Sequence, residues 1–188
     1  MDPLHGSRRY GGTAQALHWM VAGLIVTQFV LARMAAHLPL GARKLALLAE
    51  HKSVGMTVLI LAVIRLAWRM MNPPPSLPTH MNGVERVLAR VTHVSLYALL
   101  FAMPLSGWLM SSAKNYSVSW FSAFSWPNLI EPSEAAFNFF KTLHHLLSNF
   151  LFGIASLHIL AALIHHFWKR DEVLVRMLPN LKLQRKPS

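Results

Sequence analysis

The chain has 188 residues, of which 54% are hydrophobic and only 13% are charged, whereas a soluble domain carries roughly 25% charged residues. It contains no cysteine, which excludes disulfides, zinc–thiolate sites, iron–sulfur clusters and thioether-linked haem, because each needs a thiol. The formal net charge is +11, and in so apolar a chain this excess of bases indicates a lipid bilayer, not a nucleic acid, as the partner.

Four apolar segments are long enough to span a bilayer, which takes about 20 residues of helix. They cover approximately residues 14–32, 54–68, 91–110 and 146–168. The second is long enough if it begins at His51 and if Arg65 and Arg69 snorkel at its far end. Because lipid offers the backbone no hydrogen bonds, these segments are expected to be helices. The prediction is an all-α membrane protein: one four-helix transmembrane bundle over residues 8–180, followed by a basic tail at 181–188.

The charged residues predict the orientation and argue against one class of function. All seven acidic residues lie outside the four segments, whereas ion-coupled transporters usually keep a carboxylate within the membrane. With the N-terminus inside, twelve Lys and Arg residues fall on the cytoplasmic side, which favours cytoplasmic N- and C-termini. The outer side then holds six: Arg33, Arg43, Lys44, Lys52, Lys114 and Lys141.

The two longer connections differ in composition. A proline-rich, helix-breaking linker at 72–78 joins the second and third segments. The outer loop between the third and fourth segments is rich in aromatic residues suited to the membrane interface. It could serve as an aromatic anchor or as a lid over an outer site: Tyr116, Trp120, Phe121, Phe124 and Trp126.

The eleven histidines carry the candidate chemistry, because ionisable residues within a membrane are rare and histidine is a common metal ligand. His144 and His158 are fourteen residues apart in the last segment, so they share one helix face about 21 Å apart along its axis. By depth, His51 pairs with His144 on the outer side and His18 with His158 on the inner side. His145 points about 140° away from His158 around the helix and is interpreted either as a residue that supports the ligands or as an interfacial one.

Two imidazoles without an open position are typical of a low-spin haem b that transfers electrons. Zinc would need four tetrahedral ligands, which two distant pairs do not supply. Copper stays open at this point, because Met20, Met56 and Met103 lie in or near the bundle.

Five further residues are candidates for the surroundings of these pairs. His93 and His165, near the inner pair, could donate hydrogen bonds or protons to a quinone headgroup, or could simply mark the interface. Lys52, Lys141 and Arg65 are placed to meet haem propionates or small anions, although Arg65 also suits snorkelling.

Several short motifs in order resemble the bacterial cytochrome b561 family. They are Ala16-Leu17-His18-Trp19, the run from Glu50 to Gly55, the prolines at 73–75, His93 followed by Pro104 and Gly107, and an ending with Leu157-His158, His165-His166-Phe167-Trp168, Leu174, Arg176, Met177 and Pro179.

The resemblance implies a dihaem b-type cytochrome of the bacterial inner membrane that exchanges electrons with ubiquinone. It implies His18, His51, His144 and His158 as the haem ligands. One type of member oxidises superoxide at the outer face and passes the electron to quinone, which would make this chain an oxidoreductase. A periplasmic redox partner is the other candidate at that face. Two alternatives stay open: a haem-bearing anchor or carrier subunit for a partner dehydrogenase, and a metal transporter.

Overall fold

The computed structural model describes residues 9–76 and 81–178, and four long helices account for most of them. These are α1 (Gly12–Ala36), α2 (Ala42–Met71), α3 (Gly83–Ala113) and α4 (Glu134–Phe167). Each is long and apolar enough to cross a membrane, which confirms that the four predicted segments are helices of spanning length. The predicted basic tail at 181–188 lies outside the described residues.

The ends of the helices follow from local chemistry. α3 begins at a capping box, in which the Asn82 side chain accepts from the backbone N–H of Glu85 and the Glu85 carboxylate accepts from that of Asn82. Ser133 caps α4 through the backbone N–H of Ala136. α2 ends just before the prolines of the linker, where a helical backbone is disfavoured. Residues 77 and 78 of that linker lie outside the described part of the chain.

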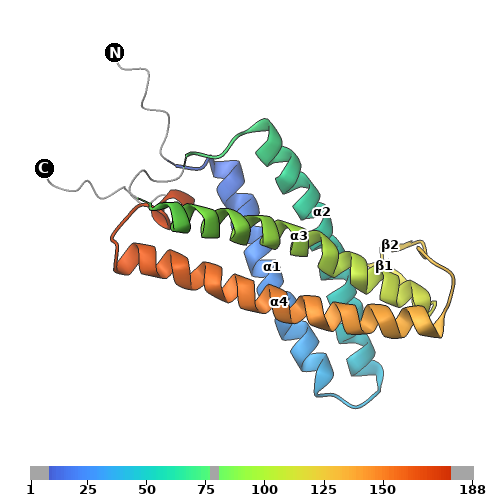
Figure 1. Cartoon of the computed structure of the whole chain (residues 1–188). Coiled ribbons are helices and arrows are strands. Elements are labelled where there is room, and N and C mark those ends of the chain that lie inside the picture. Colours follow the sequence, from blue (N-terminus) through green and yellow to red (C-terminus); the bar gives the residue numbers. More distant parts are fainter. Residues whose placement is uncertain (1–8, 77–80, 179–188) are drawn as a thin grey trace, which may run out of the picture.

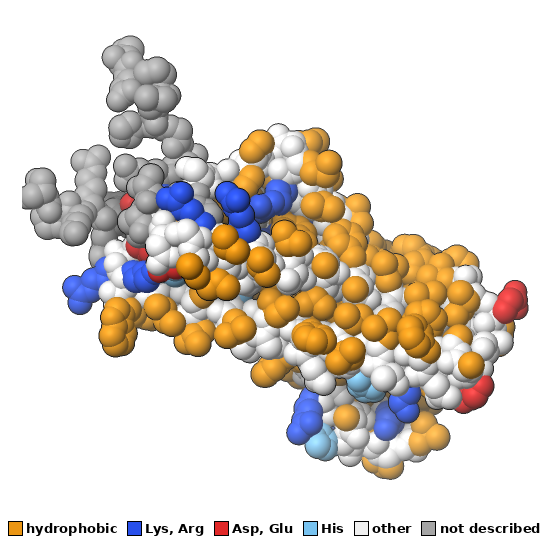
Figure 2. Space-filling model, in the orientation of Figure 1, with side chains coloured by type: hydrophobic (Ala, Val, Ile, Leu, Met, Phe, Trp, Pro, Cys, Tyr) orange, Lys and Arg blue, Asp and Glu red, His pale blue; other side chains and the backbone are white. Residues whose placement is uncertain are grey.

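The bundle consists of two helical hairpins (Figure 1). α1 packs mainly on α2, and α3 packs mainly on α4, while α2 and α3 join the two halves. A small core of Val21, Val58, Ala62 and Leu100 lies where α1, α2 and α3 meet. On the face drawn in Figure 2, hydrophobic side chains cover most of the long flank, and the acidic groups lie toward its two ends. Such a flank suits a lipid environment.

The predicted all-α fold needs one correction, because the loop after α3 forms a β-hairpin. Strands β1 (Val118–Trp120) and β2 (Phe124–Trp126) pair antiparallel, with Ser119 opposite Ser125. Phe121 and Ser122 form the turn with positive φ angles of 47° and 60°, the twist that a tight hairpin favours. Periodicity missed the hairpin because its strands are only three residues long.

The hairpin is attached to α2 by side-chain hydrogen bonds. Ser53 Oγ donates to the carbonyl of Ser119 at 2.9 Å and accepts from the N–H of Phe121 at 3.1 Å. Trp120 Nε1 donates to Thr57 Oγ1 at 3.0 Å. The aromatic loop is therefore docked on the bundle one turn beyond His51. We call this end of the bundle the hairpin end.

At the opposite end, which we call the terminal end, the chain returns across the bundle after α4. Residues 171–178, the C-terminal strap, include a short 3₁₀ helix, η1 (Val175–Met177). Gln15 Nε2 donates to the carbonyl of Arg176 at 3.1 Å, and Trp19 Nε1 donates to that of Met177 at 2.8 Å. The start of α1 and the segment after α4 are thus held together.

Candidate functional site: two pairs of histidines

The structure brings His51 of α2 and His144 of α4 together toward the hairpin end. Their ring centroids are 6.3 Å apart and their planes cross at 79°. His145, the neighbour of His144, is exposed. The helical face, together with the position of α2, therefore selects His144 as the member of the doublet that faces His51.

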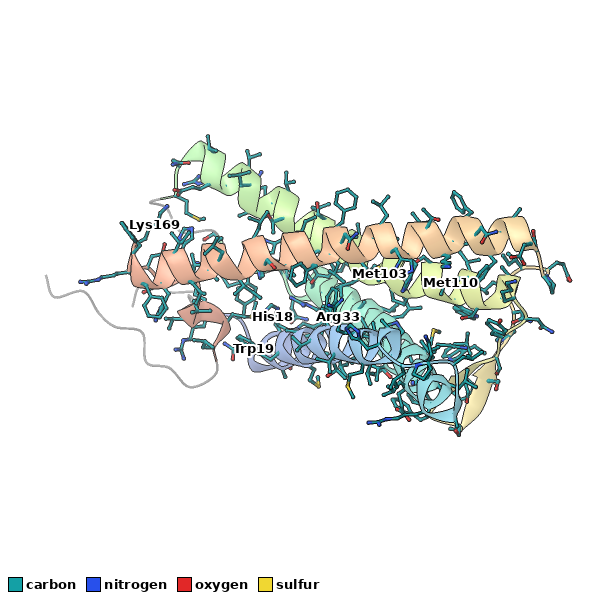
Figure 3. The ribbon with its side chains drawn as sticks, turned by 90° about the horizontal axis from the view of Figure 1, so that it is seen from below. His18, Trp19, Arg33, Met103, Met110 and Lys169 are labelled. Atoms are coloured by element: carbon teal, nitrogen blue, oxygen red, sulfur yellow. The ribbon has the colours of Figure 1, made fainter. Side chains whose placement is uncertain are left out.

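The second pair, His18 of α1 and His158 of α4, lies toward the terminal end, where His18 sits beside Trp19 near the start of α1 (Figure 3). Its ring centroids are also 6.3 Å apart, with planes crossing at 70°. A third ring, His93 of α3, contacts His158 at 5.4 Å. Sequence reasoning placed His93 near this level but did not foresee the direct contact.

The spacing within each pair tests whether a metal ion fits between the rings. Two imidazoles that bind one ion from opposite sides, with bonds of about 2.0 Å, have centroids about 6.2 Å apart. A direct N–H···N hydrogen bond would bring the centroids to about 5 Å. Both 6.3 Å pairs match the first arrangement. His93 is too close to His158 for it, so His18 is the better opposite ligand.

Two residues of α3 determine the position of His144: Ser106 bonds its ring, and Gly107 leaves room for it. Ser106 Oγ donates its single hydrogen to the carbonyl of Met103 at 2.8 Å, so it accepts from His144 Nδ1–H at 2.9 Å. Nε2 then carries the lone pair, as a metal ligand requires. A Cβ at Gly107 would lie 3.1 Å from Cε1 of His144, so the glycine allows the ring to approach α3. Such outer partners orient metal-binding histidines.

Gln28 of α1 contacts α2 at the level of His51. Gln28 Nε2 donates to the backbone carbonyl of His51 at 3.0 Å. A Cβ at Gly55 would lie 2.8 Å from the same amide nitrogen, so Gly55 leaves the space that Gln28 occupies. His51 Nδ1 and Gln28 Oε1 are buried and lack a hydrogen-bond partner within the described protein, which marks this as a polar site inside an apolar bundle.

Arg65 reaches the inner pair directly. Its Nη2 lies 3.0 Å from His18 Nδ1, and because a guanidinium can only donate, the imidazole accepts there. Nε2 of a neutral His18 then carries the hydrogen; to bind a metal through Nε2, the ring would have to carry it on Nδ1 instead and give up the bond from Arg65. A carboxylate is the acceptor that a guanidinium prefers. Arg65 also lies over the ring of Tyr97, as does Arg69.

Three lysines that the sequence places on the outer side lie near the hairpin end, and they differ in what holds them. Lys52 Nζ donates to the carbonyl of Ser117 at 2.8 Å. Lys114 bonds the Glu134 carboxylate at 2.5 Å, which raises the pKa of Lys114 above its ordinary value. Lys141 on α4 is exposed. Lys141 is therefore the best placed of the three to attract a dissolved anion.

His165, the other predicted quinone residue, lies at the terminal end against a carboxylate that sequence reasoning left without a role. His165 Nδ1 is 2.5 Å from Asp171 Oδ2. No contact between His165 and His93 is found in the described part of the chain, so the structure does not bring these two together as a direct pair. Asp171 could have been found only from its position six residues after His165, because nothing else about it stands out.

The metal alternatives find little support in the geometry. Within residues 9–76 and 81–178, no group of three or more His, Cys, Asp or Glu side chains is placed to hold a metal ion, so a tetrahedral zinc site is absent there. Met20, one of the methionines considered for copper, has 48% of its surface exposed. The two pairs of imidazoles are therefore the candidate donor sets, and pairs of this kind are typical of haem b.

The chain is similar to known proteins over most of its length. The family described as prokaryotic cytochrome b561 matches residues 9–180. The chain is 34% identical to cytochrome b561 homolog 2 of Escherichia coli (strain K12) over 171 residues, covering 90% of this chain and 91% of that protein. It is 28% identical to the probable superoxide oxidase CybB of Yersinia pestis, covering 92% and 97%. It is 26% identical to cytochrome b561 homolog 1 of E. coli, covering 93% and 99%.

Proposed function

The chain belongs to the prokaryotic cytochrome b561 family, and from this premise we propose that it conducts electrons across the bacterial inner membrane through two b-type haems. Membership implies a membrane protein that carries haem b. His51 and His144 would hold one haem at the hairpin end, and His18 and His158 the other at the terminal end. Haem b, when bound, supplies one-electron chemistry at its iron.

The observation that carries the proposal is the repetition of one geometry at two depths. Each pair joins α4 to a different helix of the other half, and each has the same 6.3 Å spacing. Along α4 the two pairs are about 21 Å apart, so together they reach across most of a hydrocarbon core of about 30 Å. A single structural metal site would not need the second pair.

The chain's own residues have defined tasks in this function. Ser106 keeps His144 in the tautomer that leaves Nε2 free, and Gly107 lets the ring sit close to α3. Arg65 lies where it could exchange its bond to His18 for one to a haem carboxylate. Apolar helices around both pairs exclude water, and this lowers the local dielectric and helps to set the redox potential.

We further propose that electrons enter at the hairpin end and leave to ubiquinone at the terminal end. The excess of basic residues predicted for the terminal side favours placing it in the cytoplasm. Superoxide as the electron donor is supported by the name of one relative, the probable superoxide oxidase CybB, and by the basic character of the outer loops. His93 and His165 are the candidates to meet the quinone.

Haem quantification and electron transfer in vesicles test the proposal. The purified protein should be red, with a low-spin b-type spectrum and two haems per chain. In proteoliposomes it should reduce ubiquinone when superoxide is generated outside. A colourless preparation would overturn the proposal in favour of transport. A red protein without quinone or superoxide activity, reduced only by a co-purifying dehydrogenase, would replace the substrate assignment with a carrier role.

Charge at the hairpin end should affect the rate with superoxide. Exchanging Lys141 for Glu is expected to slow superoxide-driven haem reduction about fivefold at low ionic strength, because an exposed base no longer attracts the anion. At about 1 M salt, where charges are screened within about 3 Å, the difference should vanish. Pulse-generated superoxide with optical detection measures the rate. The matched control is Arg90→Glu, the same charge change at an exposed position toward the terminal end; equal slowing by both would disprove local attraction.

A further inference from the structure

A buried carboxylate and a buried imidazole face each other at the terminal end. After α4 ends, the chain reverses at Arg170, whose φ is 52°, and brings Asp171 back onto the helix. The side chains of His165 and Asp171 are only 10% and 6% exposed, and His165 Nδ1 lies 2.5 Å from Asp171 Oδ2. The backbone N–H of Asp171 also donates to the carbonyl of His165 at 3.0 Å.

This contact determines which nitrogen of His165 is free to exchange a proton. An ionised carboxylate can only accept, so Nδ1 of His165 carries a hydrogen and Nε2 is the exchangeable position. The other carboxylate oxygen of Asp171 accepts from the backbone N–H of Val173 at 3.0 Å, which holds the carboxylate in its orientation. An imidazole oriented by a buried carboxylate is a common arrangement for proton transfer.

The C-terminal strap places this pair beside the haem-binding end of α1. The strap accepts hydrogen bonds from Gln15 and from Trp19, and the ring of Trp19 lies 5.3 Å from that of His18. Glu85 of α3 also interacts electrostatically with His165, and it forms an ion pair with Lys169, the residue that follows Trp168 at the end of α4. The segment that carries Asp171 is therefore bound to α1 close to His18 of the inner pair.

We infer that Asp171 is a positioning residue that orients His165 as the proton donor for quinone reduction at the terminal end. The inference rests on the proposed function. Converting a quinone to a quinol adds two electrons, delivered singly from the outer donor through the haems, and two protons. His165 Nε2 gives one proton to one quinone oxygen, and bulk water supplies the second. Water then reprotonates His165, while Asp171 stays ionised and stabilises the imidazolium.

The test is the reoxidation of the reduced, haem-loaded full chain by a short-chain ubiquinone, followed optically in H₂O and in D₂O. Asp171→Asn, which keeps the shape but not the charge, should slow reoxidation about a hundredfold, as for loss of an oriented general acid, and should enlarge the solvent isotope effect. Asp171→Glu should recover part of the rate. Reduction by dithionite should be unchanged, because it needs no proton from this pair.

Two controls separate proton transfer from simple support of the strap. Glu172→Gln alters the neighbouring carboxylate, which pairs with Arg176 within the strap, and should leave the rate unchanged. If Asp171→Asn loses haem, His165→Gln is compared with His166→Gln, and only the first should slow reoxidation. Equal rates in wild type and Asp171→Asn, or equal slowing by Glu172→Gln, would overturn this inference alone. A wild-type protein that quinone does not reoxidise would overturn the quinone assignment and this inference together.

Discussion

Exchanging His158 for alanine is expected to lower the haem content from two per chain to about one, because the inner haem loses an axial ligand that no other side chain replaces. His93 of α3 contacts His158, but with ring centroids 5.4 Å apart it packs against that ring and is too close to face it across a metal ion. The remaining haem, held by His51 and His144, should keep its low-spin spectrum. Haem-to-protein ratio and the optical spectrum of the purified variant measure the outcome.

The same experiment at the other end uses the histidine doublet as its own control. His144→Ala should remove the outer haem, and the double variant with His158→Ala should bind none. His145→Ala should keep both, since the side chain of His145 is exposed and lies off the face that His51 meets. Loss of haem from His145→Ala together with retention in His144→Ala would reverse the assignment of the outer ligand.

A valine in place of Gly107 is expected to abolish the outer haem almost completely while sparing the inner one. Even a single Cβ at this position would lie 3.1 Å from His144 Cε1, closer than carbon atoms normally approach, and 3.4 Å from its Nδ1, already in van der Waals contact. A branched side chain must push the imidazole away from Ser106, and this breaks the bond that orients its Nδ1. An imidazole pushed out of this orientation would no longer hold the outer haem.

The severity should follow the size of the added side chain. Gly107→Ala should keep part of the outer haem, because the ring could yield by a few tenths of an ångström. Gly153→Ala is the matched control on α4, because nothing lies within 4 Å of the added carbon there, and it should retain both haems. Haem content and the midpoint potential of each haem give the readout. Full haem content in Gly107→Val would show that His144 is not held as described.

The four spans and the shared face of two histidines followed from the sequence alone. Long apolar runs admit only helices in lipid, and the helical repeat then places His144 and His158 on one stripe regardless of what surrounds them. Pairing His18 with His158 and His51 with His144 by depth then needed only the direction in which each helix crosses the membrane. These are consequences of backbone geometry, so they required no knowledge of how the helices pack.

Other features depended on contacts between residues far apart in the chain. The approach of His93 to His158 and that of Arg65 to His18 join α3 to α4 and α2 to α1, and no periodicity encodes which side chains meet across such interfaces. The hairpin on α2 and the return of Asp171 onto His165 are set by short turns with positive φ angles. The sequence by itself determined the helices and their histidine faces, because local backbone physics dictates them. Only the tertiary structure decided the partners that orient each ring, because those depend on how the two halves of the bundle pack together.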